Sequence, residues 1–158
     1  MSPTARDEVR LQWLGVADIE LARATFTMMC EVFGSDDEGG VLSDGYLGGL
    51  LADPSFWALA AIDIRGDPVG GVTAHMLPMT RSESRELFIY DLAVRPDMQR
   101  RGIARRLIAQ VVERAEQHGL VAVFVPADND DAHALAFYEA IGGRAAPVTM
   151  FDLSPNSG

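Results

Sequence analysis

The stretch that decides the fold is ELFIYDLAVRPDMQRRGIARRL, residues 86–107. Its first nine residues, 86–94, are apolar on both faces, which is typical of a central, buried strand. The loop RPDMQRRG follows, and residues 103–118 then repeat apolar side chains at helical spacing. The sequence therefore predicts a buried strand, a glycine-containing turn, and a helix that begins at that turn.

The start of this helix is predicted to bind an anion. Arg100, Arg101, Arg105 and Arg106 lie in or beside its first turn, where the helix dipole disfavours cations. The unpaired backbone amides at that end, and Gly102, which lets a ligand approach the backbone, suit a multivalent anion such as a pyrophosphate. The alternative is a solvated arginine surface that pairs with the many carboxylates of the chain. The order of strand, glycine and helix start favours the anion site.

The segments on either side predict an α/β fold. We expect strands at residues 9–14, 56–64, 69–77, 121–125 and 148–153, and helices at 19–33, 43–52 and 131–141. The turn signal Arg65-Gly66-Asp67-Pro68 joins two of these strands into a hairpin. The order is β-α-α-β-β-β-α-β-α-β, a single domain over residues 1–158 with a mixed central sheet and helices on both faces. We expect frayed ends at residues 1–8 and 153–158.

The composition restricts the partners. The chain has 158 residues, 23 of them acidic and 13 basic, for a formal net charge of −10, and every basic residue is arginine. We expect neither nucleic acid nor an anionic membrane as a partner, because both would be repelled at long range. Without lysine, Schiff-base chemistry and a Walker-type phosphate loop are excluded. One cysteine, Cys30, and three scattered histidines predict no metal site and fit a reducing cytoplasm, and the sequence shows no membrane span or leader peptide.

The pattern Gln99-x-x-Gly102-x-Ala104, after a central strand, resembles the acyl-CoA-binding signature of the Gcn5-related N-acetyltransferase (GNAT) superfamily. The predicted element order also resembles that fold. The resemblance implies that acetyl-CoA is the co-substrate, that the turn amides hold its pyrophosphate, and that the end of the preceding strand pairs with pantetheine. The coenzyme-binding residues that it implies are Leu92, Ala93, Val94, Gln99, Arg100, Arg101, Gly102, Ile103, Ala104 and Arg105.

Longer stretches are similar to the small aminoglycoside 3-N-acetyltransferases that act on gentamicin-type drugs. IYDLAV, residues 89–94, and ADNDDAHALAFYEAIG, residues 127–142, carry most of this likeness. It implies acetyl transfer from acetyl-CoA to the 3-amino group of a 2-deoxystreptamine ring, by a homodimer and without a metal. Two other hypotheses stay open: a GNAT enzyme that acetylates another polyamine or a peptide amine, and a non-catalytic acyl-CoA-binding module.

Carboxylates are predicted to receive a polycationic acceptor. Asp91 stands in the central strand, where burying it unpaired would cost roughly several kcal/mol. It must therefore have a partner, as a structural carboxylate bonded to backbone amides would, face the cleft from which the amine attacks, or be partly protonated. Acidic residues at the start of the last helix are further candidates, although helix capping explains them equally well. The substrate-binding candidates are Asp36, Asp37, Glu38, Tyr90, Asp91, Asp128, Asp130 and Asp131.

Asp91 and Tyr138 are the catalytic candidates. An ammonium must lose a proton before it attacks a thioester, and Asp91 is our candidate for accepting that proton or for orienting the amine. The ordinary pKa of aspartate, about 3.9, is far below that of an amine, so burial or acidic neighbours must raise it. The superfamily resemblance implies that Tyr138 is the general acid that protonates the leaving thiolate. Asp131 and Gly143 depart from the family pattern, which often has asparagine and phenylalanine there. Weaker base candidates, which suit structural roles better, are His75 and His133.

Overall fold

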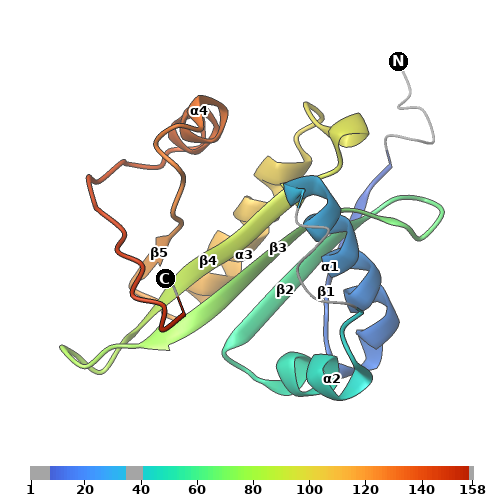
Figure 1. Ribbon diagram of the computed structural model, residues 1–158, viewed down its shortest axis with the longest axis horizontal. Coiled ribbons are helices and arrows are strands. Elements are labelled where there is room, and N and C mark those ends of the chain that lie inside the picture. The colour runs from blue at the N-terminus through green and yellow to red at the C-terminus, as the bar shows by residue number, and fades with distance from the viewer. Residues whose placement is uncertain (1–7, 35–40, 157–158) are drawn as a thin grey trace. The chain divides into compact units, whose positions relative to one another are not determined.

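The computed structural model describes residues 8–34 and 41–156, and its centre is one five-stranded sheet (Figure 1). The strands lie in the order β1 (Arg10–Trp13), β2 (Phe56–Ile62), β3 (Pro68–Pro78), β4 (Arg85–Val94) and β5 (Ala122–Phe124). Neighbouring strands from β1 to β4 are antiparallel, whereas β4 and β5 are parallel. The structure thus confirms the predicted mixed sheet, with the strand of residues 86–94 inside it.

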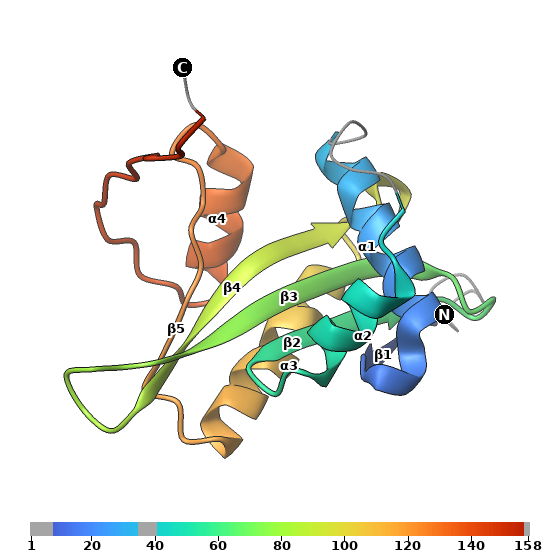
Figure 2. The same cartoon turned by 60° about the horizontal axis from the view of Figure 1, so that its bottom comes forward.

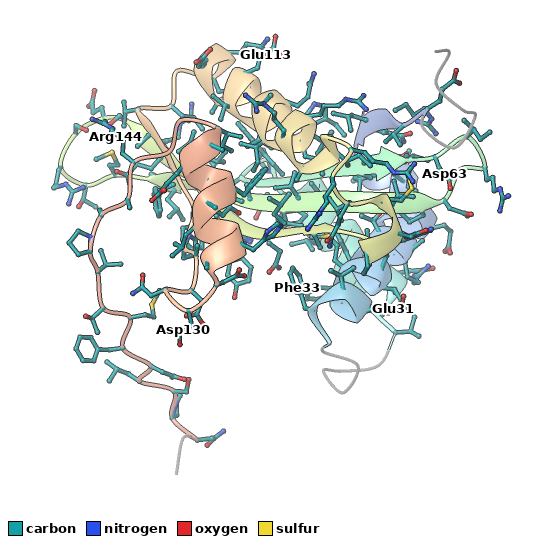
Figure 3. The ribbon with its side chains drawn as sticks, turned by 90° about the horizontal axis from the view of Figure 1, so that it is seen from above. Glu31, Phe33, Asp63, Glu113, Asp130 and Arg144 are labelled. Carbon is teal, nitrogen blue, oxygen red and sulfur yellow. The ribbon has the colours of Figure 1, made fainter. Side chains whose placement is uncertain are left out.

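Helices cover both faces of this sheet, as predicted (Figure 2). Helices α1 (Ile19–Phe33) and α2 (Asp44–Ala52) pack on one face, and α3 (Ile103–Gln117) packs on the other. In Figure 3 the sheet is seen between α3 on one side and α1 on the other. The side chains that α3 buries against the sheet are Ile103, Leu107, Ile108, Val111 and Ala115.

Two adjacent glycines in β3 let helices approach the sheet closely from both sides. A Cβ atom on Gly71 would lie 2.8 Å from Met29 Sδ and 2.9 Å from Thr25 Cγ2, and both of these residues are on α1. A Cβ atom on Gly70 would lie 3.2 Å from Ile103 Cγ2, at the first residue of α3. Gly70 and Gly71 therefore set the distance from the sheet of α1 and of the start of α3.

Local signals in the sequence set the ends of several elements. Helix α1 ends at Gly34, which has a φ of 71°, and α2 begins after Ser43, whose hydroxyl accepts a hydrogen bond from the Tyr46 amide at 3.2 Å. The turn between β2 and β3 is closed by the Asp63 carboxylate (labelled in Figure 3), which accepts hydrogen bonds from two backbone amides of the turn. The predicted hairpin and the predicted helix boundaries are confirmed here to within a residue or two.

The chain divides into two compact units, Met1–Pro126 and Ala127–Gly158. The second unit contains α4 (Ala132–Ala140), and residues 143–156 that follow it form neither helix nor strand. The strand expected at residues 148–153 is therefore wrong for the described chain. A strand exists only when it exchanges backbone hydrogen bonds with a partner strand, and the described residues 143–156 form no such pairing.

Candidate functional site

The turn between β4 and α3, residues 99–105, is called the amide turn here because backbone N–H groups dominate it. A short 3-10 helix, Pro96–Met98, leads into it, and the Gln99 side-chain amide donates to the Val94 carbonyl at 3.0 Å. This hydrogen bond holds the turn against the end of β4. Arg100 has a φ of 63° and is the only non-glycine residue in the described chain with a positive φ.

The first turn of α3 leaves backbone donors exposed. Gly102 is the residue before the helix, with a φ of 77° that favours glycine, and nothing lies within 4 Å of the place where a Cβ would stand. The first helical hydrogen bond runs from the Arg106 amide to the Gly102 carbonyl at 3.0 Å. The amides of residues 103–105 precede that bond and point out of the helix start. Open space beside Gly102 and unpaired donors at a helix N-terminus fit a diphosphate group.

The arginines around the amide turn divide into two groups. Arg95 forms a two-point ion pair with Asp97, with N–O distances of 3.0 and 2.6 Å. Arg106 donates to the Val9 carbonyl at 3.0 Å, so it holds the N-terminal segment. That bond engages part of the Arg106 guanidinium, so we expect Arg106 to contribute least to the predicted anion-binding cluster. The second group consists of Arg100, Arg101 and Arg105, which are exposed beside the first turn of α3.

One edge of β4 is free beyond its first residues. Strand β5 pairs with β4 only over Glu86–Phe88, and in the described chain no strand pairs with the rest of that edge. The predicted pantetheine residues Leu92, Ala93 and Val94 lie on this stretch, which leads into the amide turn. The Val94 carbonyl is already bonded to Gln99. The remaining free backbone groups could pair with an extended ligand that carries amide groups.

A bulge in β4 presents Asp91 and Tyr90 next to each other. Successive residues of β3 face Asp91 and Ile89, so Tyr90 between them has no partner in the ladder of β3 and β4. Asp91 shares a sheet face with Ala93, which packs against Met28 and Met29 of α1. We call the α1-side face of β3 and β4 around Asp91 the bulge face. Tyr90 is 61% exposed there.

The protonation of Asp91 is set mainly by its burial. The side chain is partly buried, and burial raises the pKa of the Asp91 carboxyl above its ordinary value, while the charge of His75 opposes that rise. No group in the described chain donates a hydrogen bond to this carboxylate, so the reading of Asp91 as a structural group bonded to backbone amides finds no support. A carboxylate with a raised pKa that solvent can still reach is suited to accept a proton.

A row of aromatic rings, which the sequence did not predict, runs along the bulge face. Each ring centroid is 5.1–6.3 Å from the next. His75, on β3, is part of this row, 5.3 Å from Phe56 and 5.7 Å from Tyr90. Alternation along the strands put the strand residues of this row on one face, and Phe26 of α1 lies beside Phe56, but only the strand register shows that the rings of the strands touch. The row consists of Phe26, Phe56, His75, Tyr90, Phe88 and Phe124.

In the second unit, two of the acidic residues before α4 accept hydrogen bonds from nearby backbone amides. The Asp131 carboxylate accepts from the Ala134 amide at 2.9 Å, and the Asp128 carboxylate accepts from the Asp130 amide at 2.9 Å. The Asp131 bond caps α4, whereas the Asp128 bond closes a local turn before the helix, and each carboxylate remains exposed with further lone pairs. Asp130 (labelled in Figure 3) is exposed as well.

Tyr138 lies on α4 and is partly buried. Burial raises the pKa of the Tyr138 phenol, and the negative charge of Asp131 raises it further, so the hydroxyl holds its proton at neutral pH. The Gly143 amide donates to the Tyr138 carbonyl at 2.8 Å, and a Cβ atom on Gly143 would lie only 2.7 Å from that oxygen. This close contact explains why a side chain such as phenylalanine is not accommodated at residue 143.

Three other predictions concern the loop, metals and membranes. The candidate acceptor residues Asp36, Asp37 and Glu38 lie outside the described residues. Within residues 8–34 and 41–156, histidine, cysteine and carboxylate side chains form no group that could hold a metal ion. In the same residues, none of the helices combines the length and the apolar character that a membrane crossing requires.

Residues 22–142 match the acetyltransferase (GNAT) family. Two solved aminoglycoside acetyltransferases from uncultured soil metagenomic samples are similar over nearly the whole chain. One is 32% identical with a TM-score of 0.87, and the match covers 93% of this chain and 98% of that one. The other, in complex with sisomicin, is 27% identical with a TM-score of 0.86, over 92% of this chain and 95% of that one.

Among curated proteins, the ribosomal protein bS18-alanine N-acetyltransferase of Salmonella typhimurium is 33% identical over 63 residues. That stretch is 40% of this chain and 43% of the relative, so the chain spans less than half the length of this curated relative. The two comparisons agree on acetyl transfer to an amine and differ in the acceptor that they suggest.

Proposed function

This chain belongs to the acetyltransferase (GNAT) family, and we propose that it is an acetyl-CoA-dependent N-acetyltransferase whose acceptor is an aminoglycoside of the gentamicin type. The observation that carries this proposal is the likeness, over more than nine-tenths of the chain, to two aminoglycoside acetyltransferases. The likeness to the curated peptide-acetylating relative covers less than half of either chain. From the sequence resemblance we propose the 3-amino group of the 2-deoxystreptamine ring as the acetylated position.

The amide turn supports the coenzyme half of the proposal. In our account the amides of residues 103–105 and the exposed Arg100, Arg101 and Arg105 hold the diphosphate of acetyl-CoA. The free edge of β4 at Leu92 and Ala93 pairs with the amide groups of pantetheine, as an added strand would. This arrangement directs the thioester along β4 toward Asp91, two residues from Ala93.

The bulge face supports the acceptor half. The amine nitrogen attacks the thioester carbonyl, a C–N bond forms, and the C–S bond breaks. In our proposal Asp91 takes the proton that the attacking nitrogen loses, directly or through water, and orients the amine. The net charge of −10 and the carboxylates Asp128, Asp130 and Asp131 favour an acceptor with several positive charges. The exposed ring of Tyr90 offers such an acceptor a cation–π contact.

The leaving thiolate needs a proton, and we propose that Tyr138 supplies it. Its phenol is protonated at neutral pH because burial and Asp131 raise its pKa. Replacing Tyr138 with phenylalanine should slow thiol release about tenfold or more while acetyl-CoA affinity stays the same. An unchanged rate would remove Tyr138 from the mechanism.

A peptide or protein N-terminal amine is the second candidate acceptor, because the curated relative is a ribosomal-protein-alanine acetyltransferase. Such an acceptor carries one ammonium group at the reacting end, whereas an aminoglycoside carries several. The net charge of −10 favours the aminoglycoside, which carries more positive charge. We also expect, from the family likeness, a homodimer that acts in the cytoplasm; light scattering of the purified protein tests the first of these.

A panel of acceptors tests the proposed function. Purified protein with acetyl-CoA should release thiol with gentamicin and sisomicin at a kcat/KM at least tenfold above that with spermidine or an alanine-terminated peptide. Mass spectrometry should show one added acetyl group, and NMR should place it on the 3-amino nitrogen. A preference for the peptide would replace the proposed acceptor, and turnover with none of these compounds would favour the acyl-CoA-binding module.

A further inference from the structure

His75 lies at the centre of the bulge face, although the proposed mechanism gives it no role. Its ring stands between two aromatic rings, with centroid distances of 5.3 Å to Phe56 and 5.7 Å to Tyr90. It is only partly buried, so it is accessible to solvent protons. Phenylalanine at this position would make the same ring contacts in the row. Histidine adds a group that can carry a charge at the proposed reacting face.

The strand register places His75 diagonally across from Asp91. Thr73 faces Asp91 across β3 and β4, and His75 is two residues further along β3, on the same face. Diagonal neighbours in an antiparallel pair are about 7–8 Å apart at Cα, and side chains on one face reach each other at that spacing. A positive charge on His75 therefore acts on the Asp91 carboxylate, and it lowers the pKa of that carboxyl against the rise that burial causes.

His75 also touches the side chain that the bulge leaves most exposed. Tyr90 lacks a cross-strand partner in the ladder, so its ring orientation depends on its side-chain neighbours. Those neighbours in the aromatic row are His75 at 5.7 Å and Phe88 at 5.9 Å, both at edge-on angles. One ring thus contacts Tyr90 and lies near Asp91, the two residues that we place beside the acceptor amine.

We propose that His75 is a positioning residue of the acceptor site, whose ring orients Tyr90 and whose charge favours the ionised form of Asp91. The part that concerns amine transfer rests on the proposed function, because it takes Asp91 as the group that receives the proton. The electrostatic part concerns this chain alone. In its protonated form His75 keeps Asp91 ionised to lower pH, and so extends toward acid the range in which Asp91 accepts a proton.

Few other titratable groups face Asp91 in the described chain. On the sheet these groups are His75 and Tyr90. Asp53, at the end of α2, lies close enough to His75 for the charge of His75 to lower the pKa of the Asp53 carboxyl. The residues that α1 buries against the sheet are Ala22, Thr25, Met28 and Met29, which do not titrate. A change in the titration of Asp91 after substitution of His75 is therefore attributable to His75.

The test compares His75→Phe with wild-type protein, because phenylalanine keeps the ring contacts and removes the charge. Carbon-detected NMR of the Asp91 carboxyl, assigned with Asp91→Asn, should show a midpoint that moves upward by about half a pH unit. The matched control is His118→Phe, since His118 stacks 5.2 Å from Trp57 at the end of α3 and should leave the Asp91 midpoint unchanged. An unchanged midpoint in His75→Phe would overturn the electrostatic role.

Enzyme kinetics then test the positioning role. The acid limb of kcat/KM for gentamicin should move to higher pH in His75→Phe. His75→Ala, which also removes the ring contacts, should in addition raise the KM for the acceptor about fivefold or more; an unchanged KM would refute the orienting of Tyr90. The NMR titration needs no acceptor, so the two proposals can fail separately. If the protein acetylates no aminoglycoside but the Asp91 midpoint still moves in His75→Phe, the proposed function is wrong and the electrostatic coupling of His75 with Asp91 stands.

Discussion

The amide turn and the bulge face are built in different ways, although both involve β4. The amide turn is local: residues 99–105 supply its backbone donors, and its one unusual demand is the positive φ at Gly102 and Arg100. The bulge face is assembled by register, from Asp91 and Tyr90 on β4, His75 on β3 and Phe56 on β2. A site made of consecutive backbone groups binds one fixed chemical group. A site made of side chains from several strands can change its acceptor when those side chains change, while the backbone site stays the same.

The largest effect should come from the bulge face. Asp91→Asn should reduce kcat with gentamicin roughly 100-fold or more, because asparagine cannot accept the amine proton. Acetyl-CoA affinity, measured by calorimetry, should stay within about twofold of wild type, since the amide turn is untouched. A fully active variant would show that Asp91 takes no part in the reaction.

A smaller effect should come from the backbone of the amide turn. Gly102→Ala should weaken acetyl-CoA binding about tenfold, because a methyl group would stand in the space left open beside the helix start. The matched control is Gly119→Ala at the other end of α3, where φ is 68° and the surrounding space is also open. Both variants should lose about 1 kcal/mol of stability, and only Gly102→Ala should lose affinity. Equal affinity losses would mean that Gly102 acts through stability alone.

The arginines of the amide turn should matter less than its backbone. Arg105→Gln should weaken acetyl-CoA binding about fivefold and make that binding less sensitive to salt, because an exposed charge pair is screened by ions. Arg106→Gln, one residue further on, should leave binding unchanged, since Arg106 is bonded to the Val9 carbonyl. If Arg106→Gln caused the greater loss, the division of these arginines would be wrong.

The smallest effect is a gain in stability at the bulge face. Folding raises the pKa of the Asp91 carboxyl. The protonated carboxyl therefore contributes fully to the stability of the fold below its unfolded-state pKa of about 3.9, and this contribution is lost as the pH rises through the folded-state pKa. Asparagine stays neutral and avoids that loss. Because solvent still reaches the carboxyl, Asp91→Asn should raise Tm by only about 1–2 °C at pH 8, and by less at pH 4. A lower Tm at pH 8 would show that the ionised carboxylate is stabilised by a partner.

The contrast between the two regions also explains what could be predicted. The buried strand, Gly102 and the start of α3 were predictable because each signal lies in one continuous stretch of sequence. The glycine at residue 119 marked the end of that helix for the same reason. In the structure the amide turn has the open backbone that the sequence indicated, and its role in coenzyme binding stays a prediction.

Features that depend on pairing could not be read from the sequence. The apolar residues at 148–153 suggested a strand, but a side-chain pattern does not say where a partner strand lies. The contact of His75 with Tyr90 requires the register of β3 against β4, and the need for glycine at residue 71 requires knowing where Met29 stands. For Asp131 the sequence left capping and substrate binding open, and the structure shows the cap.

The most direct test of the account is a crystal structure of the protein with CoA and gentamicin bound together. The account predicts the CoA diphosphate against the amides of residues 103–105, pantetheine along the free edge of β4, and a gentamicin amine within hydrogen-bond distance of Asp91. A coenzyme bound away from Gly102, or an acceptor whose amines lie away from Asp91, would contradict it.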